Sequence, residues 1–264
     1  MIKPFAGLRP APGQADAVAA PPYDVMSAAE ARDMAAGRPL SFLHISRPEV
    51  DLPADTDPYA DAVYAKARDN LDRMLADGVL VRDASPCYYR YRLTMGDHRQ
   101  TGLVAAASVA AYDADRIRKH EQTRPVKEKD RVRQIDALDA QTGPVFLVYR
   151  ADPAIDRLIT NTNDETAPEV DITAADGVRH EVWPITDSEQ IAALTRAFNG
   201  LEALYVADGH HRSAAAARVA ARRRAGSAQP DPEAAYEHFL SVIFPHDQLQ
   251  ILPYNRVVKV LRGL

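Results

Sequence analysis

The sequence feature that most constrains the fold is an abrupt change of pattern within residues 201–225. Residues 201–207, which are apolar apart from Glu202, are typical of a buried strand, and residues 213–225 are rich in alanine, the strongest helix former. Five residues without an apolar side chain, Asp208-Gly209-His210-His211-Arg212, separate them. A strand, a turn and a helix in succession indicate a mixed α/β protein. Hairpin patterns elsewhere favour the α+β class over a plain doubly wound sheet.

The segment Asp208–Arg212 has the composition of a phosphate-binding turn. Gly209 permits a backbone turn that other residues resist, and the amides after it open a helix whose free N–H groups and positive dipole attract phosphate. Arg212 can hold phosphate oxygens in bidentate fashion, and Asp208 can bind magnesium or orient a histidine. The structural alternative is that Asp208 caps the helix while the histidines lie on the surface. Five such residues in a row favour the functional interpretation.

A metal site built from Asp208, His210 and His211 is disfavoured. Side chains of adjacent residues point in different directions, so both histidines cannot readily bind one metal ion. No spacing of cysteine and histidine elsewhere completes a zinc ligand set. We therefore assign no metal ligands from the sequence.

The patterns of most other segments predict alternating helices and strands. Ser27 and Glu30 form a capping box, and apolar residues at three- and four-residue steps predict the clearest helix over residues 58–77. Alternating residues around Gly96-Asp97 predict a hairpin. Residues 151–187 are polar and are expected to be irregular. We expect one elaborated domain over 1–264, with a subregion at 1–110, a core at 111–150 and 188–264, and an insertion at 151–187.

The segment Arg116–Arg133 is unusually basic. It carries eight lysines and arginines against three acidic residues, in a chain whose net charge is −5. A locally positive surface attracts polyphosphate, although a solvated helix face with i,i+4 pairs explains the run equally well. For Glu121, which lies in this run, the residue types alone favour neither interpretation.

Two further segments are candidates for the wall of a pocket. In Pro21-Pro22-Tyr23-Asp24, paired prolines impose an extended backbone ahead of an aromatic residue and a carboxylate. This corner is equally consistent with a structural turn and with a substrate-binding wall. Near the end of the chain, Arg256 can bind a carboxylate or a phosphate.

Composition restricts the classes of partner and the cellular location that we expect for this protein. A net charge of −5 argues against a general nucleic-acid binder, which is usually basic. The single cysteine, Cys87, cannot form an internal disulfide. The sequence shows neither a signal-peptide pattern nor a run of 18 apolar residues. We expect a soluble, cytoplasmic protein whose partner is a small-molecule substrate rather than a nucleic acid or a membrane.

Several motifs follow one another along the chain: Pro21–Val25, His120–Thr123 with Lys127, Asp130 and Arg131, Gly143–Phe146, Ala207–Arg212, and Leu252-Pro253 before Asn255-Arg256. Together they resemble the bacterial domain-of-unknown-function family 1015, and the likeness covers nearly the whole chain. Members of that family are usually longer at the C-terminus, so we expect this chain to be shorter than a complete member. The family name implies no activity.

The Asp208–Arg212 turn is also similar to the signature of the ParB/sulfiredoxin-like fold, and most closely to the free serine kinase built on it. That resemblance implies a nucleotide-binding core with large insertions, and ATP or ADP with Mg²⁺ as the cofactor. It implies Glu121 as the catalytic base. Around it we expect Asp208 and His211 as further catalytic residues. The expected nucleotide-binding residues are His120, Gly209, His210 and Arg212. The expected substrate-binding residues are Tyr23, Asp24 and Arg256. The sequence departs from the kinase in spacing, because residues 151–200 separate the two motifs.

These observations predict a nucleotide-dependent kinase for a small hydroxyl compound, with free L-serine as the first candidate. Two other functions stay open. ParB-like folds also bind nucleotide to switch partner interactions, which needs only a binding turn and a dimer surface. One alternative is therefore a nucleotide-binding regulatory module without turnover, for which a homodimer is the expected assembly. The other is a phosphohydrolase or nuclease in which His210 or His211 assists the leaving group. A nuclease should have a wide basic groove, which the net charge does not favour.

Overall fold

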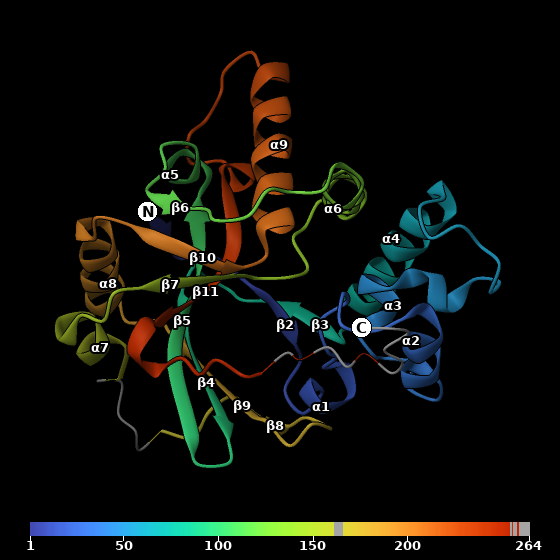
Figure 1. Ribbon diagram of the computed structural model, residues 1–264, viewed down its shortest axis with the longest axis horizontal. Coiled ribbons are helices and arrows are strands. Elements are labelled where there is room, and N and C mark those ends of the chain that lie inside the picture. The colour runs from blue at the N-terminus through green and yellow to red at the C-terminus, as the bar shows by residue number, and fades with distance from the viewer. Residues whose placement is uncertain (161–165, 254, 256–257, 259–264) are drawn as a thin grey trace.

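The computed structural model describes residues 1–160, 166–253, 255 and 258, and its centre is a mixed β-sheet (Figure 1). Its strands follow the order β6-β10-β7-β11-β5-β4-β9-β8, and β1 pairs with β5 outside this path. The strands are β1 (Ile2–Lys3), β4 (Tyr88–Met95), β5 (His98–Ser108), β6 (Ile117–Arg118), β7 (Val145–Tyr149), β8 (Val170–Thr173), β9 (Arg179–Ile185), β10 (Leu204–Asp208) and β11 (His238–Pro245). We call this sheet and the helices packed on it the sheet body.

Both parallel and antiparallel pairs occur in the sheet. β4 and β5 form the predicted antiparallel hairpin, and Gly96 at its tip has a φ of 56°. β11 runs antiparallel to β5 and parallel to β7, whereas β10 runs antiparallel to β7 and parallel to β6. Strands distant in sequence therefore meet at the sheet, and the end of β10 lies beside the start of β7.

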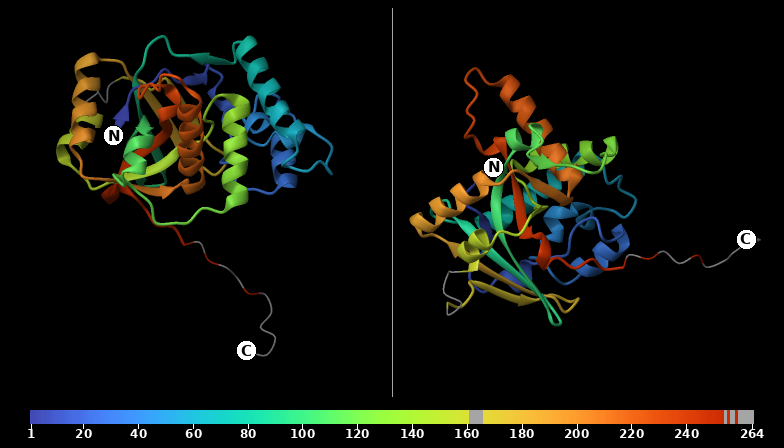
Figure 2. Two further views of the ribbon diagram at one scale, coloured as in Figure 1. Left: turned by 90° about the horizontal axis from the view of Figure 1, so that it is seen from above. Right: turned by 60° about the vertical axis from the view of Figure 1, so that its left-hand side comes forward.

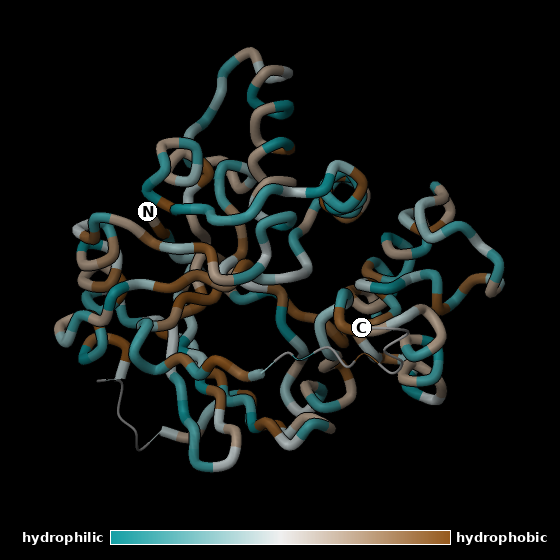
Figure 3. The backbone as a smooth tube through the Cα atoms, viewed as in Figure 1, coloured by the Kyte–Doolittle hydropathy of each residue, from teal (hydrophilic) through white to brown (hydrophobic). Residues whose placement is uncertain are grey.

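Two helix pairs flank the sheet (Figures 1 and 2). α7 (Pro153–Thr160) packs on α8 (Ser188–Gly200), and α6 (Pro125–Leu138) packs on α9 (His210–Gly226). The short α5 (Val109–Asp113) also contacts α9, and the 3₁₀ helices η2 (Ala235–Glu237) and η3 (His246–Gln248) flank β11. The alanine-rich sequence of α9 allows close approach, because Ala215, Ala216 and Ala220 are buried against the core. The brown strands in Figure 3 mark the apolar centre that these helices cover.

A second, smaller core lies in residues 8–82, which we call the N-terminal helical unit. It contains β2 (Leu8–Pro10), α1 (Ala15–Val18), α2 (Ala28–Ala35), α3 (Leu43–Ser46), the 3₁₀ helix η1 (Pro48–Asp51), α4 (Asp61–Ala76) and β3 (Leu80–Arg82). Ile45, Leu71 and Met74 pack in this core, and Leu138 from the end of α6 joins them. α6 therefore touches both regions, packing on α9 on one side and on α4 on the other.

The mixed α+β fold predicted from the sequence is confirmed, as are the capping box of α2 and the helix over most of residues 58–77. The expectation that residues 151–187 are irregular is wrong, because they contribute α7, β8 and β9. These elements are short and interrupted by polar residues, and they gain their stability from the sheet edge and from α8 rather than from local pattern. Within the described part of the chain, no helix has the length and apolar character needed to cross a membrane.

Candidate functional site

The turn after β10 has the geometry that the sequence predicted for Gly209. This residue is the N-cap of α9 and adopts a left-handed conformation with a φ of 94°. A Cβ atom at this position would lie 3.2 Å from the Cα of Val145 and 3.3 Å from the Cζ of Arg212. Both the backbone conformation and the close neighbours therefore favour glycine. α9 begins at His210, not at Ser213 as expected, so His210, His211 and Arg212 form its first turn.

Arg212 folds back over this turn and connects three segments. Its Nη2 donates a 2.6 Å hydrogen bond to Asp208 Oδ2, and its Nη1 donates to the carbonyl oxygen of Pro144. The same guanidinium lies 4.0 Å from the Asp24 carboxylate of the N-terminal proline-rich loop. A Cβ at Gly143 would lie 3.4 Å from the Arg212 side chain, so the loop before β7 also closes on it. The Arg212 guanidinium thus lies at the N-terminus of α9, where it contacts the carboxylates of Asp208 and Asp24.

His210 is buried, with 4% of its surface exposed. The backbone N–H of His120 donates to its Nε2 at 3.5 Å, and its Nδ1 lies 3.5 Å from Glu121 Oε2. The His120 ring contacts it edge to face, at 4.4 Å between centroids. Because Nε2 accepts a hydrogen bond, the neutral ring carries its hydrogen on Nδ1, which faces the Glu121 carboxylate.

His211 makes the second contact with the segment before α6. Its Nε2 accepts a 3.0 Å hydrogen bond from the backbone N–H of Arg124. Burial lowers the pKa of His211, and the positive charge of Lys127 lowers it further. Burial and the neighbouring His120 likewise lower the pKa of His210. Both imidazoles are therefore neutral at pH 7 and act as hydrogen-bonding groups rather than as cations.

Three potential ligand atoms for a metal ion converge at the same place. One atom each from His120, Glu121 and His210 lies within 4.8 Å of the other two. Two imidazoles and one carboxylate suit zinc and similar transition metals better than magnesium. The sequence pattern placed His210 with Asp208 and His211 and did not indicate this set, because His120 and His210 lie 90 residues apart in the chain. The parallel pairing of β6 with β10 brings the two segments together.

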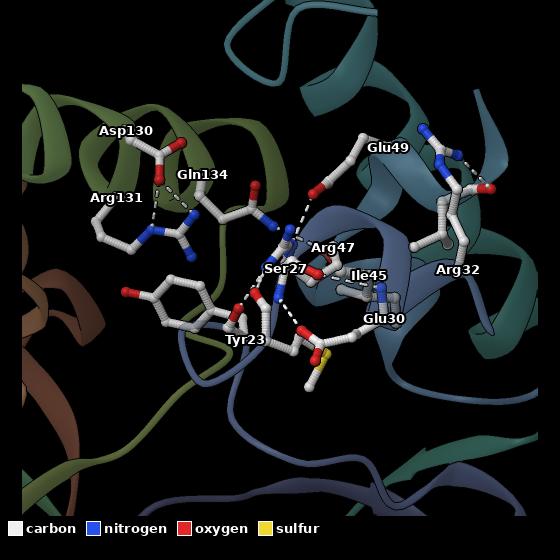
Figure 4. Close-up of polar contacts among 12 residues, drawn as sticks. Tyr23, Ser27, Glu30, Arg32, Ile45, Arg47, Glu49, Asp130, Arg131 and Gln134 are labelled. Atoms are coloured by element: carbon white, nitrogen blue, oxygen red, sulfur yellow. Dashed lines mark hydrogen bonds and ion pairs between the residues drawn. The ribbon is translucent and has the colours of Figure 1, made fainter. Parts of the chain in front are cut away.

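A polar cavity of about 190 Å³ lies beside the turn, between α6 and the N-terminal helical unit. Tyr23 forms part of its wall, and the Arg131 guanidinium stacks 4.0 Å above the Tyr23 ring. Arg47 donates hydrogen bonds to the backbone carbonyls of Tyr23 and Met26, at 2.7 and 2.9 Å, and pairs with Glu49 at 2.6 Å (Figure 4). These bonds fix the proline-rich loop against the cavity.

A smaller hollow of about 30 Å³ continues from this cavity toward the turn. Both hollows share Tyr23, Arg131 and Gln134, and the smaller one is also lined by Gly143 and Arg212. The Tyr23 side chain thus stands between the cavity and the arginine of the turn. Burial raises the pKa of the Tyr23 hydroxyl, which stays protonated as a hydrogen-bond donor.

The structure brings together nearly all the site residues predicted from the sequence. His120, Glu121 and Asp208–Arg212 meet at the start of α9, and Tyr23 and Asp24 adjoin them. Arg256 lies outside the described residues. Sequence reasoning missed Ser46, Arg47, Glu49 and Tyr64, which line the cavity from the N-terminal helical unit. The sequence feature that could have indicated these lining residues is the largely polar stretch Ser46–Glu49, which directly follows an apolar segment.

A family model described as "Protein of unknown function (DUF1015)" matches residues 2–264 of the chain. Comparisons with curated proteins and with solved structures give no match.

Proposed function

The chain belongs to the DUF1015 family, and we propose that it is a nucleotide-dependent phosphotransferase that acts on a small hydroxyl compound. The observation that carries this proposal is the joint geometry of the α9 N-terminus, Arg212 and Glu121. Phosphate donors lie at the first turn of α9, and the Glu121 carboxylate lies 3.5 Å from the Nδ1 of His210 in the same turn. The polar cavity lined by Asp24 is near this turn, since Asp24 lies 4.0 Å from Arg212, and it gives an acceptor a place to bind.

The phosphate end of the site supports nucleotide binding. The first amides of α9 have no partner within the helix, and the helix dipole adds a partial positive charge there. Arg212 supplies a planar guanidinium suited to phosphate oxygens. Lys127 and Arg124 stand close enough to lower the pKa of His211 through their charge. A nucleotide polyphosphate is the anion that such a surface favours.

Phosphoryl transfer needs positioning and charge neutralisation more than covalent participation by the protein. A magnesium ion bound with the phosphates would neutralise part of their charge, and Asp208 is the carboxylate of the turn that can contact it. The acceptor oxygen forms a bond to the terminal phosphorus as the bond to the leaving nucleotide breaks. Glu121 takes the hydroxyl proton of the acceptor, and the Nδ1 hydrogen of His210 keeps the carboxylate in place.

The direct test is phosphorus NMR of the full chain with Mg²⁺ and either ATP or ADP, each with and without L-serine. A phosphomonoester signal that requires L-serine supports the proposal. Glu121→Ala should abolish this signal and leave nucleotide binding intact, since Glu121 touches the acceptor and not the phosphates. Resonances that broaden without turnover would instead indicate a nucleotide-binding switch of the ParB-like kind.

The ligand set His120, Glu121 and His210 favours one alternative, a metal-assisted phosphohydrolase. There Glu121 would be a ligand rather than a base, and a metal-bound water would attack the phosphate. Release of inorganic phosphate without L-serine, stimulated by Zn²⁺ or Mn²⁺ and lost in His120→Ala, would support it. The surrounding positive charges of Arg124, Lys127 and the helix N-terminus oppose cation binding, so the phosphotransferase is the better-supported function.

A further inference from the structure

Two adjacent histidines of α9 hold the segment that carries the proposed base. This segment, residues 119–124, has no helix or strand of its own and connects β6 to α6 (Figure 1). The backbone N–H of Arg124 donates a 3.0 Å hydrogen bond to His211 Nε2. The backbone N–H of His120 donates to His210 Nε2 at 3.5 Å. The two bonds lie on either side of the base, so one turn of α9 holds both ends of a short irregular segment.

The hydrogen bond from Arg124 determines where the His211 ring carries its hydrogen. A neutral imidazole has one N–H group and one nitrogen that accepts. Because Nε2 accepts the backbone N–H, the ring hydrogen is on Nδ1. The nitrogen that could take a proton from a substrate is therefore already used within the protein. This contact argues against the proton transfer that the sequence suggested for His211.

Little packing restrains the segment 119–124. Apart from the half-buried Thr123, its residues are exposed. Lys119 lies over the Tyr112 ring of α5, and the Thr123 hydroxyl donates to Glu128 of α6. These contacts join the segment to α5 and to α6, whereas the bonds to the imidazoles join its main chain to α9. Exposed segments with few buried contacts open easily, so the bonds to α9 matter for the position of the base.

The turn that holds the segment is also the turn proposed to bind phosphate. His211 directly precedes Arg212, and both lie in the first turn of α9. A shift of the segment relative to α9 would therefore move Glu121 relative to the phosphates. A displacement of about 1 Å between reacting groups can lower a rate about 10²-fold. The bond between Arg124 and His211 should accordingly affect kcat more than nucleotide affinity.

From these contacts we propose that His211 is a positioning residue, which holds the main chain at Arg124 so that Glu121 stays aligned with the phosphates, and which transfers no proton itself. This inference rests on the proposed phosphotransferase, since it concerns the base of that reaction. It gives the two histidines different roles. His210 contacts the Glu121 carboxylate, at 3.5 Å, and His211 holds the backbone three residues further along the chain.

Glutamine and alanine at position 211 separate positioning from proton transfer. The side-chain amide of glutamine can place an oxygen near the position of Nε2, so His211→Gln retains an acceptor for the Arg124 N–H but has no group that titrates. His211→Ala has neither. We expect His211→Ala to lower kcat about 10²-fold and to change KM for the nucleotide less than about threefold. His211→Gln should retain at least about a third of the original kcat.

His246→Ala is the matched control, because it removes the same kind of bond elsewhere. The Nδ1 of His246 accepts a hydrogen bond from the backbone N–H of Ala151, also at 3.0 Å. This contact follows the end of β7, whereas Asp208 of the turn pairs with Phe146 near its start. We expect His246→Ala to change kcat less than about twofold. A loss as large as that of His211→Ala would overturn a specific role for His211.

Hydrogen exchange of the Arg124 amide, followed by NMR of the full chain, tests the contact without turnover. Exchange should be about tenfold faster in His211→Ala and nearly unchanged in His211→Gln. Unchanged exchange in His211→Ala overturns the positioning role, whatever the turnover. So does a His211→Gln variant that protects this amide but is as inactive as His211→Ala, since His211 would then transfer a proton. If the unaltered chain forms no phosphomonoester, the phosphotransferase is refuted, and faster exchange in His211→Ala still upholds His211 as the residue that holds the segment.

Discussion

The sheet body and the N-terminal helical unit contribute to the site in different ways. The sheet body contributes backbone groups to the site. These are the left-handed Gly209 and the N-terminal amides of α9, which the end of β10 positions. The helical unit supplies side chains held by ion pairs and by hydrogen bonds to loop carbonyls, with Arg47 at the centre. The backbone groups of the sheet body therefore depend on a few residues that are close together in the sequence. The side chains of the N-terminal helical unit depend on packing between segments that are far apart in the sequence.

The largest expected effects are on the free energy of unfolding, when a buried residue is removed from the core of either region. Phe198 is fully buried in the sheet body, against Tyr149 at 5.4 Å, and Met74 is 1% exposed in the smaller core. We expect Phe198→Ala to lower the free energy of unfolding by about 3–5 kcal/mol, and Met74→Ala by about 2–5 kcal/mol. Urea unfolding measures both values.

Ligand binding by the same two variants separates the regions. Met74→Ala should weaken L-serine binding and spare ADP binding, because the smaller core positions α3 and α4 but not the turn. Phe198→Ala should weaken ADP binding more than L-serine binding. Equal losses of both ligands in both variants would mean that the regions form one unit rather than two.

The sequence allowed prediction of the site residues in the sheet body, but in the N-terminal helical unit it indicated only Tyr23 and Asp24. Asp208–Arg212 indicated a turn because glycine, helix-forming alanines and an apolar strand are local signals. The contacts of Arg47 with Tyr23 and of Tyr64 with Asp130 join residues 24 and 66 positions apart, and no local pattern encodes them. α7, β8 and β9 were missed for the same reason, since their stability comes from distant neighbours.

Replacement of Arg212 by alanine tests the phosphate-binding role of the sheet body. We expect kcat/KM for the nucleotide to fall about 10²–10³-fold, the usual cost of one donor at a developing charge. L-serine affinity in the absence of nucleotide should change little. Arg222→Ala is the matched control: it lies ten residues along α9 and loses a surface pair with Asp136. A loss of similar size in both variants would assign the effect to the helix rather than to the phosphate contact.

Gly209→Ala tests whether the backbone conformation of the turn matters. The φ of 94° and the 3.2 Å approach to the Cα of Val145 predict a loss of about 1–3 kcal/mol in unfolding free energy. Nucleotide affinity should fall as the turn shifts. Gly200→Ala is the control, because no atom lies within 4 Å of a Cβ there and its φ is not positive. That variant should be neutral or slightly more stable, so equal destabilisation of the two would refute the argument.

The smallest expected effect is a loss of stability in acid that originates in the sheet body. Burial lowers the pKa of His180, His210, His211 and His238, and all four lie in that region. In the unfolded chain their pKa is about 6.5, so below this pH the unfolded state binds protons that the folded state does not. Stability is therefore complete above about pH 6.5 and declines as the pH falls toward the lowered values. Urea unfolding at pH 8 and pH 5.5 should show this decline. His238→Gln, away from the site, should reduce the difference between the two pH values, whereas an unchanged difference would place the acid sensitivity elsewhere.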